Sequence, residues 1–379
     1  MSLAPRIRIE RPDLRAVLLV AIASACGFGT FYGLYTSAPV ALAGGSVSAG
    51  TRTAVFMVCV VAVQPLVTIF GRWLRVRSRS VGGGLAAMAV GFAVLPFADG
   101  WPGLVLTGLG FGVFVVTSAA WTRELADAST AGRALGIYGL ASAIGGTLAA
   151  PGALALANSV GVVGVAIAGA VVTALGLIPV AAARRVGERG HAGLTDAPTD
   201  HVPTVARSGS AQTAATGPDG AGSSGSAMVA VAAPTILVHT LAVIAYGLML
   251  TSAGALSDSD AGSVALVAAF SVQGAVALGR PVAGWLADRW SGPGTMLVAS
   301  VVVALALTWA VVDDDPLRFV VAATAVGAAS GAVQTAALTV MMRRAVTQGQ
   351  AERVSMAWNV AFDVALGLAA ALATRLALV

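Results

Sequence analysis

Long apolar stretches recur along the whole chain, each bounded by polar or charged residues. A helix needs about 20 mostly apolar residues to cross a bilayer, where lipid offers its backbone no hydrogen-bond partner. Eleven stretches approach or reach that length, at residues 16–43, 51–71, 81–98, 103–122, 134–157, 160–183, 229–254, 262–283, 295–312, 317–342 and 353–375. The alternating ten-residue segments typical of a membrane β-barrel do not occur in the sequence. The pattern predicts an all-α integral membrane protein with about eleven transmembrane helices.

Composition supports this prediction. Hydrophobic residues make up 57% of the 379 residues and charged residues only 10%, whereas soluble domains carry about 25% charged residues. The abundant Gly and Ala favour helices that pack closely on one another. The apolar run at 16–43 is too long for a signal peptide, whose apolar segment has about 7–15 residues. We therefore expect it to remain as the first membrane helix.

The basic residues, all of them Arg, predict the orientation. With the N-terminus in the cytoplasm, 19 of the 22 fall on the cytoplasmic side, and only Arg52, Arg318 and Arg375 fall outside. Cytoplasmic loops of membrane proteins carry such an excess of positive charge. The distribution predicts a multi-pass protein of the cell membrane. It also accounts for the net charge of +5 without a nucleic-acid partner.

Residues 184–227 differ in composition from the rest, being rich in Gly, Ser, Thr, Ala, Asp and Pro. Such a segment buries too little apolar surface to fold, so we expect a disordered cytoplasmic linker. It divides the chain into an N-terminal bundle of six helices, residues 1–183, and a C-terminal bundle of about five, residues 228–379.

The two halves are weakly similar in sequence. A shift of 220 residues superposes Arg123 on Arg343 and Tyr138 on Trp358. The counterpart of the stretch at 160–183 would then lie beyond Val379. On this interpretation the chain lacks the twelfth helix of a six-plus-six plan and its C-terminus lies outside; a missed or merged span is the alternative.

The segment from Gly284 to Arg289 reads Gly-Trp-Leu-Ala-Asp-Arg and resembles the signature loop of the major facilitator superfamily. That family repeats the loop after the second helix, where this chain has Arg75 in place of the acid. Residues 139–151 resemble the Gly- and Pro-rich fifth helix of the family's drug-efflux branch, and residues 358–363 resemble the eleventh helix of related efflux proteins. The Arg in the fourth helix of proton-linked exporters has no counterpart, because Leu104 and Leu106 occupy the expected positions.

The resemblance implies two helical bundles that rock around a site near the membrane midplane. Independently of the resemblance, we expect the Asp288 carboxylate to contact the N-terminal end of a helix in the opposite half, beginning near Arg133, or to pair with Arg343 or Arg344, in one gate state only. A solvated turn is the alternative for this loop. The predicted gating residues are Gly284, Asp288, Arg289, Arg343 and Arg344.

Polar side chains deep in apolar helices are the default candidates for function. Asp363 is the acid nearest mid-membrane, and we expect it to load and release a proton; a structural hydrogen bond, for instance with Asn359, is the alternative. His239 is the second candidate for proton coupling. The substrate-cavity candidates, each with helix packing or helix-to-helix hydrogen bonding as its alternative, are Tyr32, Tyr35, Phe114, Tyr246, Gln273, Gln334 and Asn359.

These features favour a secondary active transporter of a small, fairly apolar organic solute, exporting it by antiport with protons. An uptake permease for a neutral metabolite is one alternative, and a non-transporting truncated remnant acting as a partner subunit is another. The chain has no Lys and no phosphate-binding Gly-x-x-x-x-Gly-Lys loop, which excludes ATP-driven transport by that motif. The sequence shows no cluster of acidic residues with a partner base, so we do not expect an enzyme. We also expect no metal or cofactor. The expected partners are the solute, membrane lipid and protons, and we expect a monomer.

Overall fold

The computed structural model describes residues 14–42, 49–69, 77–126, 131–195, 221–255, 262–312, 315–344 and 348–376. Within these residues the chain is helical, and one short 3₁₀ turn, η1 (Ala98–Gly100), precedes α4. The helices are α1 (Leu14–Ala41), α2 (Ala49–Ile69), α3 (Arg77–Val94), α4 (Trp101–Glu124), α5 (Ala131–Val160), α6 (Val162–Thr195), α7 (Ala221–Ala255), α8 (Gly262–Arg289), α9 (Gly292–Ala310), α10 (Pro316–Arg344) and α11 (Gln348–Leu376). Each of the eleven predicted stretches corresponds to one helix, which confirms the all-α fold class.

Nine helices of the described chain are long and apolar enough to cross a membrane. The two others are α2, whose apolar part Thr51–Val67 is shorter, and α3. The first turn of α3 contains Arg77 and Arg79, which leaves fewer apolar residues in the helix. Both pack within the bundle, α2 on α4 and α3 on α4 and α6. Their weaker apolar signal is thus consistent with a position among other helices.

Three helices extend by six or more residues beyond the apolar stretches that predicted them. α6 continues to Thr195 and α7 begins at Ala221, so helix occupies both ends of the segment predicted as a disordered linker. Its middle, residues 196–220, lies outside the described residues. α8 continues to Arg289, so the motif at 284–289 is the end of a helix rather than a loop. A helix satisfies its own backbone, and therefore it need not stop where the apolar pattern ends.

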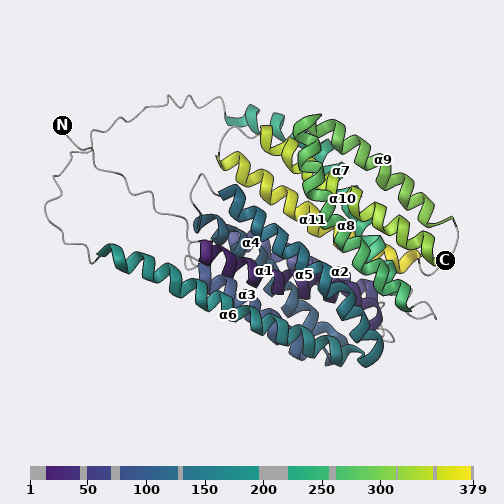
Figure 1. Ribbon diagram of the computed structural model, residues 1–379, viewed down its shortest axis with the longest axis horizontal. Coiled ribbons are helices and arrows are strands. Elements are labelled where there is room, and N and C mark those ends of the chain that lie inside the picture. The colour runs from purple at the N-terminus through teal and green to yellow at the C-terminus, as the bar shows by residue number, and fades with distance from the viewer. Residues whose placement is uncertain are drawn as a thin grey trace.

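The helix directions define two ends of the bundle. α6 ends and α7 begins at one of them, which we call the linker end; α11 ends at the opposite, far end (Figure 1). The described Arg residues at the linker end include Arg123, Arg289 and Arg344, whereas Arg52 and Arg318 lie toward the far end. This arrangement agrees with the charge asymmetry of the sequence, which predicts that the linker end is cytoplasmic.

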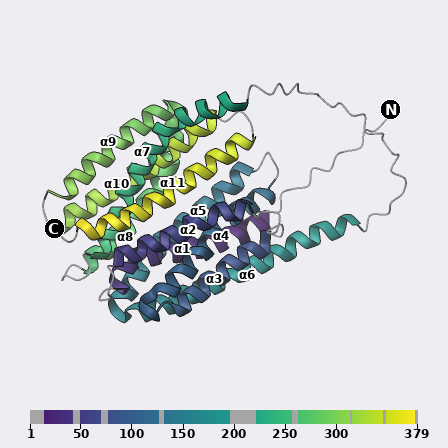
Figure 2. The same cartoon turned by 180° about the vertical axis from the view of Figure 1, so that it is seen from behind.

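The helices form two groups, α1 to α6 and α7 to α11, that lie side by side in both views (Figures 1 and 2). Their packing is repeated: α1 packs on α5 as α7 packs on α11, and α3 packs on α4 as α9 packs on α10. The groups meet where α2 contacts α11, where α5 contacts α8, and where α1 contacts α7. These contacts have the symmetry expected of two related bundles, so the weak internal repeat corresponds to a structural one.

Glycine allows the closest of these helix contacts. A Cβ atom on Gly145 of α5 would lie 2.1 Å from the carbonyl oxygen of Ala25 on α1. In the second group, a Cβ atom on Gly279 of α8 would lie 2.1 Å from the carbonyl oxygen of Ala328 on α10. No side chain fits at such distances, so glycine is required wherever two helix backbones approach this closely.

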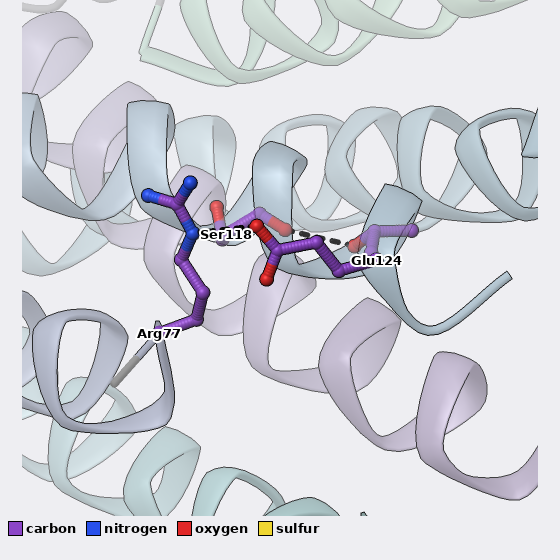
Figure 3. Close-up of polar contacts among 4 residues, drawn as sticks. Arg77, Ser118 and Glu124 are labelled. Atoms are coloured by element: carbon purple, nitrogen blue, oxygen red, sulfur yellow. Dashed lines mark hydrogen bonds and ion pairs between the residues drawn. The ribbon is translucent and has the colours of Figure 1, made fainter. Parts of the chain in front are cut away.

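Polar contacts fix the linker end of α3, α4 and α5. Figure 3 shows Arg77, the first residue of α3, facing Glu124, the last residue of α4. The Arg77 Nε donates to Glu124 Oε1 over 2.9 Å. Both side chains are partly exposed, so we expect this pair to stabilise the fold by only about 0–1 kcal/mol. Earlier in α4, the hydroxyl of Ser118 lies 2.9 Å from the hydroxyl of Tyr138 on α5, and this contact connects the two helices.

Candidate functional site

The predicted proton-coupling acid lies at the contact between the two halves. Asp363 is in the middle of α11 and is 6% exposed. Its Oδ2 accepts a 2.5 Å hydrogen bond from the Nε2 of Gln64 on α2. Gln64 is 3% exposed, so the pair is almost completely removed from solvent. A buried carboxyl therefore forms one of the direct polar connections between the halves.

A second hydrogen bond joins the halves nearer the far end. The hydroxyl of Tyr35 on α1 donates to the carbonyl oxygen of Leu366 on α11 over 2.8 Å. α11 comes close to α2 in this region, because a Cβ atom on Gly367 would lie 3.1 Å from the Cβ atom of Met57. Tyr35 is fully buried. These two hydrogen bonds hold the halves together at the middle and toward the far end.

Two tyrosines, one from each half and each followed by Gly-Leu, meet between the halves. The tripeptide Tyr-Gly-Leu occurs at residues 32–34 of α1 and again at residues 246–248 of α7. The hydroxyl of Tyr32 interacts with Tyr246 and with Arg280. Tyr246 in turn donates a 2.5 Å hydrogen bond to the Oε1 of Gln273 on α8. Three of the substrate-cavity candidates are thus brought together at the junction of the halves.

Arg280 lies among these candidate residues, although the charge pattern of the sequence groups it with the cytoplasmic Arg residues. It lies inside α8, one residue after Gly279, and is only partly exposed. Its Nη2 donates to the Oε1 of Gln334 on α10 over 2.8 Å. The signal was in the sequence: Arg280 falls within the apolar stretch 262–283, and the helix continues for nine residues beyond it. The charge therefore belongs to the interior and not to a loop.

An aromatic stack lies beside Arg280 and Gln334. The rings of His239 on α7 and Trp358 on α11 stack with their centroids 4.8 Å apart, and Phe362 continues the stack at 5.9 Å from Trp358. The indole nitrogen of Trp358 donates to the backbone oxygen of Gln334 over 3.2 Å. The ring nitrogens of His239 make no hydrogen bond of good geometry among the described residues; the backbone of Trp358 is the polar group beside them.

Two other cavity candidates lie differently. Phe114 is fully buried inside the first half, where its ring contacts Gly27 of α1 and its ring centroid is 6.2 Å from that of Phe28. Its environment is helix packing, the alternative that the sequence left open. Asn359 is partly buried on α11, one helical turn before Asp363. It makes contacts of its own, but the partner that the structure gives to Asp363 is Gln64.

The predicted gating residues lie at the linker end. Gly284, Asp288 and Arg289 are in the last two turns of α8, and Arg289 stacks over the ring of Trp285 at 5.8 Å from its centroid. Arg343 and Arg344 end α10 and are exposed, with interaction partners of their own. The side chain of Asp288 lies outside the described part of the structure, so the proposed gate contact stays a prediction.

Known membrane transporters share the fold of this chain. A model of the Major Facilitator Superfamily matches residues 17–374. A bacterial homologue of the human lysosomal transporter Spinster, in an inward-facing and unoccupied conformation, has a similar structure, with a TM-score of 0.67, 14% identity, and coverage of 94% of this chain and 81% of that one. An auto-inhibited peptide transporter of the POT family has a TM-score of 0.64 and 12% identity, covering 96% and 89%. Identities this low show the fold alone. A search of curated protein sequences gave no match.

Proposed function

Because the chain belongs to the major facilitator superfamily, a family of secondary transporters, we propose that it exports a small organic solute across the cell membrane in exchange for protons. The family assignment supports a secondary transporter of small solutes in a multi-pass membrane protein. The export direction rests on the resemblance of residues 139–151 and 358–363 to efflux proteins. Alternating access requires a site between the halves that opens to one side at a time.

The observation that carries the proposal is the hydrogen bond between Gln64 and Asp363. It connects α2 to α11, so it is made or lost when the halves move relative to one another. When the halves separate, water reaches this carboxyl from one side of the membrane at a time, and a proton can be exchanged with that side. Proton loading at Asp363 is thereby coupled to the opening of the interface, which is the coupling that an exchanger needs.

Substituting Asp363→Asn tests this coupling. The amide keeps a polar group of similar size but binds no proton. We therefore expect proteoliposomes with this variant to lose pH-gradient-driven accumulation across a panel of dyes, antibiotics and organic acids. Counterflow of the same solute, which needs no net proton movement, is expected to continue.

The matched control is Asp99→Asn, which makes the same chemical change at an exposed residue of η1. It should accumulate solute as the native chain does. If the Asp363→Asn variant accumulates solute as well as the native chain does, Asp363 has no part in proton coupling. If the variant loses counterflow together with accumulation, the substitution damages solute binding or the fold.

A further inference from the structure

The charge of Arg280 has no carboxylate partner among the described side chains. Its hydrogen bond is to the neutral Gln334 amide, and the hydroxyl of Tyr32, also neutral, lies nearby. Asp363 also interacts with Tyr32, but its hydrogen bond is to Gln64, and it makes no ion pair with Arg280 within 4.0 Å. A cation inside a membrane protein is costly unless something balances it, and such charges commonly mark a substrate pathway.

Two buried amide groups near Arg280, those of Gln334 and Gln273, each have a donor without a partner among the described residues. Arg280 only donates, so the Gln334 atom that it contacts must be the oxygen. This fixes the orientation of the amide, and its Nε2 then has no partner in the described structure although Gln334 is fully buried. The Nε2 of Gln273 is likewise unpaired, while its oxygen accepts from Tyr246. Unmade hydrogen bonds of buried groups are expensive.

An excess of donors around an unbalanced positive charge is complementary to an anion with several acceptor oxygens. A carboxylate has two such oxygens and binds guanidinium groups through paired hydrogen bonds. The neighbouring indole of Trp358, which is partly exposed and bonded to the backbone of the same Gln334, offers an apolar surface. Aromatic rings favour stacking on such a surface.

We infer that the transported solute is an aromatic monocarboxylate, whose carboxylate binds Arg280 and the Gln334 amide while its ring packs against Trp358. The inference rests on the proposed function, because it names the substrate class of that transporter. Export of a monoanion in exchange for a proton moves positive charge inward, which a negative cell interior favours.

Ligand-induced thermal stabilisation of the purified full chain in detergent tests the inference without any transport. Cys26 and Cys59 are free and partly buried, so a thiol-reactive dye reports unfolding. The probes are indole-3-acetate, phenylacetate and 1-naphthoate, each against its neutral amide, with tryptamine as a cation. A ligand that binds the folded state raises the unfolding midpoint. We expect millimolar carboxylates to raise it by a few degrees and the amides and tryptamine to leave it unchanged.

Substitutions at Arg280 and Gln334 locate the effect. Arg280→Gln removes the charge, and loss of a hydrogen bond to a charged group weakens binding by about 10- to 100-fold. Gln334→Glu keeps Arg280 but places an anion beside it, so it should also abolish the carboxylate response. Arg79→Gln, at an exposed position of α3, is the matched control and should respond like the native chain. The unfolding midpoint of each variant without ligand shows whether it is folded.

Binding without carboxylate selectivity, or no stabilisation by any of the three carboxylates, would overturn the inference. So would an undiminished response in folded Arg280→Gln or Gln334→Glu protein. The Asp363→Asn variant separates this inference from the proposed proton coupling. It leaves Arg280, Gln334 and Trp358 unchanged, so it should bind the carboxylates as tightly as the native chain, even where it no longer responds to a pH gradient.

Discussion

At the scale of single residues, a few hydrogen bonds in apolar surroundings connect the halves of this transporter. The hydroxyl of Tyr35 and the amide of Gln64 each reach α11 from the first half. A typical intramolecular hydrogen bond contributes about 0.5–1.5 kcal/mol. That is small against the stability of a folded membrane protein, but it is a substantial part of the free-energy difference between two gate states, which is a few kcal/mol. Such bonds therefore influence conformation more than stability.

Tyr35→Phe is expected to weaken closure at the far end. The substitution removes only the hydroxyl that donates to Leu366, so about 0.5–1.5 kcal/mol of interaction between the halves is lost. The population open at the far end should rise by about 2- to 10-fold. Pulsed EPR distances between spin labels at the far ends of α2 and α11, in a background without the native cysteines, measure this population.

Tyr138→Phe is the matched control, because its hydroxyl contacts Ser118 within the first half. Its distance distribution should match that of the parent. If Tyr35→Phe leaves the distribution equally unchanged, the hydrogen bond to Leu366 has no part in holding the far end closed.

At the scale of helices, small residues determine how closely the bundle packs. Lipid gives little hydrophobic drive for helix association, so helices associate through close van der Waals contact. α1 and α5 approach so closely that Gly29 of α1 also faces α5, where a Cβ atom would lie 3.1 Å from the carbonyl oxygen of Gly145. The first half is thus built around a backbone contact that few other residues permit.

Gly145→Ala should destabilise the first half. The added Cβ atom would lie 2.1 Å from the oxygen of Ala25, so α1 and α5 must separate. Overpacking of this kind costs about 1–3 kcal/mol. The unfolding midpoint in detergent should fall by several degrees, and less folded protein should be recovered.

Gly152→Ala on the same helix provides the comparison. No atom lies within 4 Å of the position that an alanine Cβ atom would occupy there, and alanine is the better helix former. Its midpoint should stay equal or rise slightly. Equal midpoints for the two variants would mean that α1 and α5 tolerate separation, contrary to the packing described above.

At the scale of the whole molecule, the chain combines repeated packing with an uneven distribution of charge. α2 with α11 and α5 with α8 form equivalent contacts across the interface. The described Arg residues concentrate at the linker end, the end that the positive-inside rule places in the cytoplasm. The symmetry places an interface between the two halves, and the distribution of Arg residues sets the orientation of the protein in the membrane.

The orientation has a direct test. α11 begins at the linker end and ends at the far end, so a reporter fused after Val379 should be exposed outside the cell. A protease site inserted between residues 196 and 220 should be cleaved only from the cytoplasmic side. Cytoplasmic activity of the C-terminal reporter, or cleavage from outside, would contradict the predicted topology.

The apolar pattern alone predicts the number and type of the helices, because lipid makes length and apolarity the deciding properties of a span. It also indicated Asp363, since an acid within an apolar stretch is rare enough to be recognised without a structure. The Arg asymmetry predicts the orientation by the same kind of one-dimensional reasoning.

Which polar groups meet depends on how the helices pack in three dimensions. Gln64 and Asp363 are 299 positions apart in the chain, and nothing local in either helix pairs them. Arg280 looked like one of many cytoplasmic charges until α8 placed it beside Gln334 and Tyr32. Phe114 looked like a cavity residue, yet it faces Gly27 inside the first half. The sequence gives the side chains that each helix contains. The face that a helix presents to its neighbour depends on packing between segments far apart in the chain.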